Sequence, residues 1–161
     1  MKDNKKINKT RKNRGYAWEK TIVNRYNLKY NWEAMRLGGA SSFLPDVLLI
    51  HSEMSTIISV EAKSGTTDNL YVPWDQIERC YRFVNKFKKY DYRYVMLAFK
   101  FSQVKRISST KKTTRPLREY FYRWDGEIHN IADHVCTYDG KMFQLISNGK
   151  RIPVTMEDFW S

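Results

Sequence analysis

The chain has 161 residues, of which 42% are hydrophobic and 15% aromatic, so it can form one domain with its own core. Lysine and arginine outnumber aspartate and glutamate by 29 to 17, and the net charge of +12 favours a nucleic acid, a membrane surface or an acidic protein as partner. This composition argues against a disordered chain, and no apolar run is long enough to span a bilayer. The lack of such a run leads us to expect a soluble protein. Neither of the two cysteines has a partner at the spacing of a zinc site or of a disulfide framework, which fits a reducing compartment.

The positive charge is concentrated in two segments. Residues 1–14 hold seven basic residues and one acid, and residues 100–118 hold seven basic residues and no acid. We therefore predict a flexible basic arm over residues 1–13, a single domain over residues 14–161, and a basic loop around residues 108–114. Either segment alone could be a solvated tail, but two such segments on a nearly neutral domain favour contacts with phosphates.

Apolar residues recur at helical spacing near the N-terminus. Trp18 and Ile22 belong to one stripe, which predicts an amphipathic helix between residues 15 and 29. A strand-like stretch follows over residues 31–37, and small residues predict a loop over residues 38–42.

The next segment predicts a hairpin and a second helix. Strands are expected over residues 45–50 and 56–61, with a turn at residues 51–55. Pro73 suits the first position of a helix. The apolar stripe of that helix consists of Ile77, Cys80, Tyr81, Val84 and Phe87.

The remaining chain is rich in strand-forming residues. Two further strands are predicted over residues 93–99 and 120–124. Turn signals at Asp139-Gly140 and Asn148-Gly149 predict a hairpin in the tail. No linker or internal repeat divides the chain, and the order of elements predicts a mixed α/β or α+β domain.

Three charged residues fall on the two central strands. If the turn is centred between residues 53 and 54, Asp46 lies opposite Glu61 across the hairpin. Side chains alternate along a strand, so Glu61 and Lys63 point to one face, where Asp46 joins them. A slip of one residue would move each side chain to the other face, so the grouping depends on this register.

Two carboxylates and an ammonium group at the end of a sheet suit a divalent metal site for phosphodiester hydrolysis. Mg²⁺ prefers oxygen ligands, commonly carboxylates together with waters and a phosphate oxygen. Asp46 and Glu61 supply carboxylates, and the backbone carbonyl of Ala62 is a further candidate ligand. Lys63 is expected to activate the attacking water or to stabilise the transition state. Glu19, on the first helix, is placed to reach the same metal directly or through water.

Each motif has a plainer explanation when it is taken alone. A Pro-Asp pair at a strand start is often only a turn, and Glu-x-Lys on a strand is often a solvated ion pair. The combination is less common, because Glu61 follows Asp46 by 15 residues and both lie between Glu19 and Gln76. The joint pattern therefore favours catalysis.

This combination resembles the PD-(D/E)xK nuclease superfamily and, within it, the archaeal Holliday junction resolvases. The matching residues are Arg14-Gly15, Glu19, Arg36 with the loop to Ser42, Pro45-Asp46, Glu61-Ala62-Lys63, Tyr71-Val72, Asp75-Gln76-Ile77 and Leu97 to Phe101. The resemblance implies a restriction-endonuclease-like core, in which helices flank a central mixed β-sheet. It also implies a homodimer that uses Mg²⁺ or Mn²⁺ to cut symmetric strands of four-way DNA junctions in recombination and repair. Such an enzyme is expected to be cytoplasmic and associated with the nucleoid.

The resemblance also implies roles for individual residues. Glu19, Asp46 and Glu61 correspond to metal ligands, and Lys63 corresponds to the catalytic lysine. Ser42 corresponds to the last serine of a family loop that reads Ser-Gly-Ser, where this chain has Ala-Ser-Ser. The expected DNA contacts, including those of the basic segments, are Arg14, Arg36, Ser41, Gln76, Lys100, Lys105, Arg106, Lys111 and Lys112.

Two other functions remain open at this point. The chain could be a different nuclease on the same fold, such as a bacterial recombination resolvase or a restriction-like enzyme, although it is short for one that must also read bases. It could also be a DNA-binding protein that has lost catalysis, although intact Asp46, Glu61 and Lys63 argue against this.

A homodimer needs an interface, and the chain has aromatic residues beyond the two helical stripes. They could line an interface between two copies or complete the core behind the sheet. These residues include Tyr92, Tyr94, Phe121, Tyr122 and Trp124.

Overall fold

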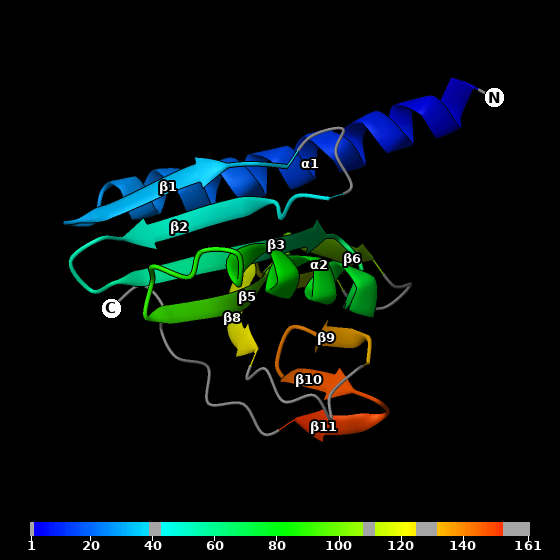
Figure 1. The fold of residues 1–161 in the computed structure, drawn as a ribbon. Helices are drawn as coiled ribbons and strands as arrows, with labels where there is room; N and C mark the ends of the chain where they lie inside the picture. The colour runs from blue at the N-terminus through cyan, green and yellow to red at the C-terminus, as the bar shows by residue number, and fades with distance from the viewer. Residues whose placement is uncertain (1, 39–42, 108–111, 125–131, 153–161) are drawn as a thin grey trace.

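A five-stranded mixed sheet forms the centre of the computed structural model, which describes residues 2–38, 43–107, 112–124 and 132–152 (Figure 1). Its strand order is β1-β2-β3-β5-β8, and only β3 and β5 are parallel neighbours. The strands are β1 (Trp32–Arg36), β2 (Val47–His51), β3 (Thr56–Gly65), β5 (Tyr92–Phe101) and β8 (Arg118–Trp124). The predicted α+β fold with a central mixed sheet is confirmed.

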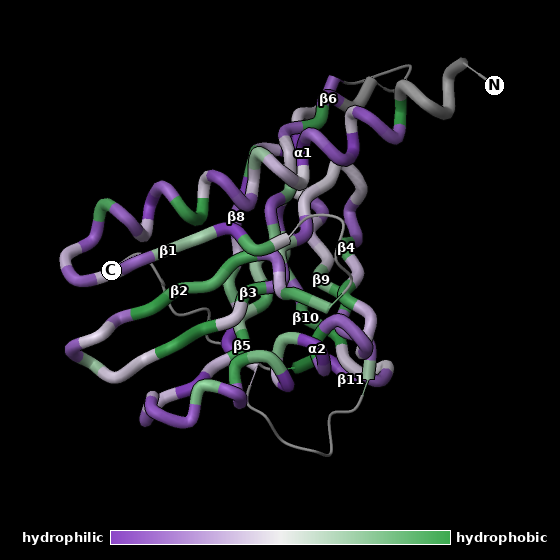
Figure 2. The backbone as a smooth tube through the Cα atoms, turned by 45° about the horizontal axis from the view of Figure 1, so that its top comes forward, coloured by the Kyte–Doolittle hydropathy of each residue, from purple (hydrophilic) through white to green (hydrophobic). Residues whose placement is uncertain are grey.

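Two helices cover opposite faces of this sheet. The first, α1 (Lys2–Asn27), packs on one face through Trp18 and Ile22, which are buried as predicted. The second, α2 (Trp74–Val84), covers the other face through Ile77 and lies in the crossover between β3 and β5. Figure 2 shows hydrophobic colour along β2 and β3, and together with the buried residues of β5 these strands form the core between the helices. No helix in the described ranges has the length and apolar character needed to cross a membrane.

The first helix begins earlier than the sequence indicated. We expected it to start near Gly15, after a flexible arm, whereas α1 starts at Lys2. Residues 2–14 contain neither glycine nor proline, and lysine and arginine are good helix formers, so an existing helix can extend through them at little cost. Residues 7–13 are exposed, so the basic side chains of this part extend along a helix in contact with solvent.

A second sheet lies on the side of the molecule away from α1 (Figure 1). Its four antiparallel strands have the order β11-β10-β9-β4. They are β4 (Asn69–Val72), β9 (His134–Tyr138), β10 (Phe143–Ser147) and β11 (Lys150–Ile152). Asn148 and Gly149 have φ values of 50° and 70°, as a two-residue hairpin turn between β10 and β11 requires. The hairpin predicted in the tail is therefore confirmed.

The second basic segment forms strands where we expected a loop. β6 (Val104–Ile107) pairs with β7 (Lys112–Arg115), and residues 108–111 lie outside the described ranges. Thr113 and Thr114 are β-branched and favour extended backbone, which explains why this part joins a hairpin. The loop prediction is wrong for residues 112–114.

Candidate active site

β2 and β3 pair in the predicted register, and this register sets the position of Asp46. Val47 pairs with Val60, and the Asp46 N–H donates to the Val60 carbonyl at 3.1 Å. The Asp46 side chain accepts a hydrogen bond from the Ala62 N–H, with 2.8 Å between Oδ2 and N. Asp46 therefore lies where β2 begins, beside the second half of β3.

Glu61 lies on β3, on the face that α2 covers, and its side chain is 2% exposed. Lys63 Nζ donates to Glu61 Oε1 at 2.8 Å, and Arg79 Nη2 donates to Oε2 at 2.6 Å. A buried carboxylate needs such partners, because desolvation of an unpaired charge is costly. The predicted convergence of Glu61 and Lys63 on one face is confirmed, with a cation on each oxygen of Glu61.

The Asp46 carboxyl lies in surroundings that disfavour its ionised form. Burial raises its pKa from 3.8 to about 6, and the negative charge of Glu61 acts in the same direction. The hydrogen bond from the Ala62 N–H opposes this rise in pKa, but does not cancel it. Two carboxylates that repel each other in this way favour a cation between them.

The surroundings of Asp46 fit an oxygen-ligated cation. A Cβ atom on Gly38 would lie 3.2 Å from Asp46 Oδ1, so the glycine keeps this flank of the carboxylate open. Gln76 lies one turn before Cys80 on α2, and its buried Oε1 has no hydrogen-bond partner among the described residues. Acceptor oxygens and open space are what Mg²⁺ and its waters require.

Glu19 does not join the other two carboxylates. It forms an ion pair with Arg36, whose guanidinium lies 4.2 Å from the centroid of the Tyr16 ring. Within the described ranges, no three histidine, cysteine, aspartate or glutamate side chains are grouped to hold one metal ion. In this structure the predicted three-carboxylate set is therefore reduced to Asp46 and Glu61, although Glu19 is near enough to raise the pKa of Asp46.

A comparison with models of protein families identifies the family of this chain. Residues 10–134 match the family model described as archaeal Holliday junction resolvase (Hjc). The chain belongs to this family. The match includes Glu19, Asp46, Glu61 and Lys63, and it extends further along the chain than the motifs noted in the sequence. The family consists of nucleases that act on Holliday junctions.

A solved structure similar to this chain is that of Hjc from Archaeoglobus fulgidus, described as a Holliday junction resolvase from an archaeal hyperthermophile. The two chains are 19% identical, with a TM-score of 0.48, and the alignment covers 68% of this chain and 76% of the other. A comparison with curated proteins finds no match.

The DNA contacts that the family resemblance implies differ in their surroundings. Arg14 is half-buried on α1, whereas Lys105 and Lys112 are exposed on the β6–β7 hairpin. Lys100 forms an ion pair with Glu119 at 3.4 Å and is only 23% exposed. The structure does not describe Ser41, Ser42 or Lys111, nor the side chain of Arg106.

Arg79 is the member of this site that sequence reasoning missed. It lies on α2 three residues after Gln76, and beside Cys80, whose Sγ lies 3.9 Å from Glu61 Oε2. The helical spacing from Gln76 was the available signal, since residues three apart share a face of a helix. That the face meets Glu61 became visible only when α2 was packed on β3.

We expect Asp46→Asn to be more stable than the wild type at about pH 7.5 without divalent cations. The folded state raises the pKa of Asp46 to about 6, so ionisation of this group destabilises the fold as the pH rises from about 4 to about 6. Asparagine removes that charge. Because the side chain is partly exposed, we expect a gain of about 1 to 2 kcal/mol in the free energy of unfolding, measured with urea in EDTA. A gain that persists at about pH 4 would contradict this explanation.

Proposed function

We propose that this chain is a metal-dependent endonuclease that cuts four-way DNA junctions by paired hydrolysis of two symmetric strands. The observation that supports this activity best is the convergence of Asp46, Glu61 and Lys63 beside β3, in a member of the resolvase family. Carboxylates and an ammonium group at one point suit phosphodiester hydrolysis.

The proposed cofactor is Mg²⁺, which Mn²⁺ can replace. Asp46 and Glu61 would hold the ion, together with the Ala62 carbonyl. A strand residue directs its N–H and its carbonyl to the same side, and the Ala62 N–H is directed to Asp46. When bound, the ion would polarise the scissile phosphate and lower the pKa of the attacking water.

The protein side chains then have distinct tasks. Lys63 is 26% exposed, so its ammonium group can reach a phosphate at the surface and stabilise the negative charge that builds in the transition state. Arg79 is less exposed, at 19%, and its hydrogen bond to Oε2 holds the Glu61 carboxylate in one orientation. Lys63 therefore acts on the substrate, whereas Arg79 positions a ligand.

Purified protein should be incubated with Mg²⁺ and either a labelled four-way junction or linear duplex of the same sequence. The proposal expects paired cuts in the junction and little cleavage of the duplex. Equal cleavage of both substrates would indicate another nuclease on this fold. Tight binding without cleavage would indicate a DNA-binding protein.

We expect deletion of residues 1–13 to weaken binding to junction and duplex alike. The segment has six basic residues and one acid, and its described side chains are exposed. If its cations bind phosphates, the slope of log K against log salt should become shallower by up to about 0.9 for each phosphate that the shortened protein no longer binds. Titrations at several salt concentrations measure this slope, and an unchanged slope would show that the segment does not touch DNA.

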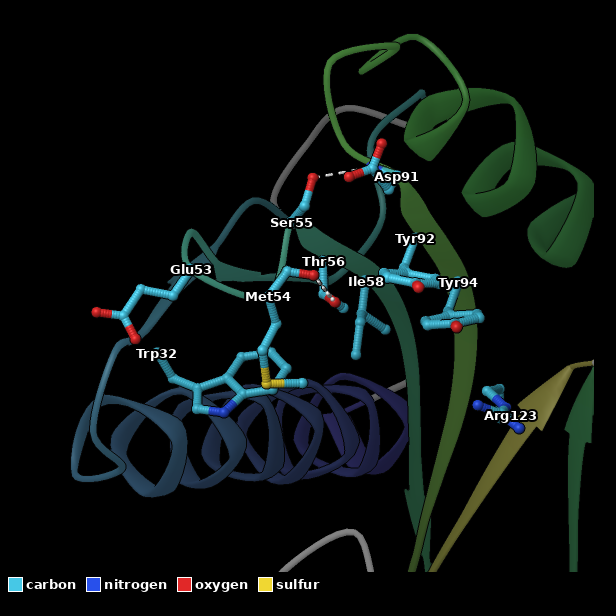
Figure 3. Close-up of a pocket in the computed structure, with 10 residues that line it drawn as sticks. All are labelled: Trp32, Glu53, Met54, Ser55, Thr56, Ile58, Asp91, Tyr92, Tyr94 and Arg123. Atoms are coloured by element: carbon cyan, nitrogen blue, oxygen red, sulfur yellow. Dashed lines mark hydrogen bonds between the residues drawn. The ribbon is translucent and has the colours of Figure 1, made fainter.

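The proposed enzyme is a homodimer, since two strands must be cut and each chain has one site. Phe121, Tyr122 and Trp124 are between 4% and 8% exposed and complete the core, whereas Tyr92 is 55% exposed. Figure 3 shows Tyr92 beside Tyr94 on β5, in a groove of about 610 Å³ at the end of β3 away from Glu61. An exposed apolar groove of this size is a suitable surface for a second copy.

We expect a dimer at micromolar concentration without DNA, measured by sedimentation. Tyr92→Asp should shift the mass toward the monomer, because it places a charge in an apolar contact. The matched control is Tyr30→Asp, since Tyr30 is 85% exposed in the turn between α1 and β1. A mixed dimer of wild-type and Asp46→Asn subunits should nick one strand per junction. A monomeric mass both free and on junction DNA would refute the dimer.

A further inference from the structure

Arg36 is held in a fixed orientation beside the proposed active site. It is the last residue of β1, and the N–H of the next residue, Leu37, donates to the carbonyl of Asp46 at 2.9 Å. Its Nε donates to Glu19, and its guanidinium lies 4.2 Å from the centroid of the Tyr16 ring. A phosphate bound by Arg36 would therefore lie beside the proposed metal site.

These contacts leave the outer edge of the guanidinium free for a ligand. Tyr16 and Glu19 are three residues apart on α1, so the ring covers one face of the planar group while the carboxylate takes its Nε. No described residue accepts a hydrogen bond from the two Nη groups of Arg36, and the side chain is 32% exposed. Two Nη groups in this arrangement match two oxygens of a phosphate.

The same face of α1 continues toward the N-terminus with exposed lysines. Residues at intervals of three or four share one face of a helix, and this face of α1 carries Lys9, Lys12, Tyr16 and Glu19. Lys9 and Lys12 are both exposed, on the part of α1 that extends beyond the sheet in Figure 1. At 1.5 Å per residue, Lys9 and Glu19 are about 15 Å apart along the helix axis. Lys9, Lys12 and Arg36 therefore form a row of cations that ends beside Asp46.

Such a cation row suits the backbone of one DNA strand. Phosphates recur about every 3.4 Å along each strand of a duplex, so a row of about 15 Å can span several of them. A lysine ammonium group is a point charge that tolerates different phosphate positions, whereas the fork of Arg36 fixes one phosphate. Residues 4–18 contain no aspartate or glutamate, so no carboxylate of this segment competes with a phosphate for the lysines.

We propose that phosphates of one DNA strand lie along this face of α1, and that Tyr16 and Glu19 position Arg36 to bind the phosphate nearest the metal site. The inference rests on the proposed function and gives the cleaved strand a path to Asp46 and Glu61. In this arrangement Glu19 is a positioning residue for Arg36 rather than a metal ligand.

The path is tested by the affinity of the full chain for a four-way junction, in EDTA, with one phosphate at a time replaced by an uncharged methylphosphonate. Arg36→Gln should weaken binding by about 10-fold, the loss expected for a hydrogen bond to a charged group. At one position, replacement should weaken wild-type binding but not that of Arg36→Gln, since the two changes remove the same contact. Lys12→Gln should show this at another position of the same strand. Arg11→Gln is the matched control, because Arg11 is exposed in the same segment on a different face of α1.

The positioning roles are tested at the phosphate that Arg36 binds. Its replacement should cost less affinity in Tyr16→Leu and in Glu19→Ala than in the wild type, because the guanidinium is then less well held. Tyr16→Phe should keep the full cost, since the ring remains. Tyr30→Leu is the matched control for the tyrosine, because Tyr30 is 85% exposed near the other end of β1.

Binding of Mn²⁺ to the protein without DNA tests whether Glu19 is a metal ligand. Glu19→Gln should keep the wild-type affinity for Mn²⁺, whereas Asp46→Asn should lose about 10- to 100-fold. Equal losses in these two variants would overturn the role of Glu19. An Arg36→Gln profile with the same positions as the wild type, or equal changes in Arg11→Gln and Lys12→Gln, would overturn the path.

These results separate the inference from the function on which it rests. If wild-type protein prefers and cuts junctions while the variants keep the wild-type methylphosphonate profile, only the inference fails. If the wild type binds junction and duplex equally and cuts neither, the proposed function fails, whatever the profiles of the variants.

Discussion

Asp46→Asn is expected to lower the rate of junction cleavage by at least about 10- to 100-fold, while junction binding stays nearly unchanged. The substitution removes an anionic ligand but no positive charge, and it keeps an oxygen that can accept the hydrogen bond from the Ala62 N–H. Glu61→Gln should have the same effect, since its carboxylate is the other proposed anionic ligand and is near enough to raise the pKa of Asp46. Single-turnover cleavage with saturating Mg²⁺ measures the rate.

The control for this prediction is Glu33→Gln, which removes one carboxylate from an exposed position on β1. It should cleave at the wild-type rate. Binding in EDTA and thermal unfolding of all three variants show whether they are folded. Cleavage by Asp46→Asn or Glu61→Gln at more than about a tenth of the wild-type rate would refute the metal site, since loss of a ligand costs more than this.

Arg115→Ala is expected to lower the free energy of unfolding by about 2 to 3 kcal/mol through loss of its hydrogen bonds, a large fraction of the stability of a domain of this size. Arg115 is 2% exposed. Its guanidinium donates to the carbonyls of Thr67, Thr66 and Ser102 at 2.8, 3.0 and 2.9 Å. It also pairs with Asp68 at 2.9 Å, so alanine would remove the one donor group that these four acceptors share.

Urea unfolding followed by circular dichroism measures this loss. Arg115→Lys should recover only part of it, because an ammonium group cannot reach the same carbonyls as the planar guanidinium. The matched control is Arg118→Ala, an exposed arginine from the same basic segment, which should change stability by less than about 0.5 kcal/mol. Equal effects at both positions would contradict the structural role of Arg115.

The sequence by itself determined the local elements and the centre of the site. Two short apolar runs on either side of a turn identified the β2–β3 hairpin, and the short turn limits the possible registers, so the position of Asp46 beside β3 followed from neighbouring residues. The faces of Glu61 and Lys63 followed from strand alternation. The buried stripe of α2 could also be predicted, since Ile77 and Cys80 occur at helical spacing in the sequence and both are buried.

Only the tertiary structure decided which charged residues pair. Arg79 pairs with Glu61, and Arg36 pairs with Glu19, through contacts between elements that are separate in the sequence. Arg115 belongs to a basic segment that composition assigns to solvent, yet it is buried against the loop before β4. The composition of a segment gives its net charge, and the spacing of its charged residues shows which of them share a face of a helix or strand. The partner of a charge depends on how distant segments pack, because a buried ion is stable only where folding brings its counter-charge and hydrogen-bond acceptors to it.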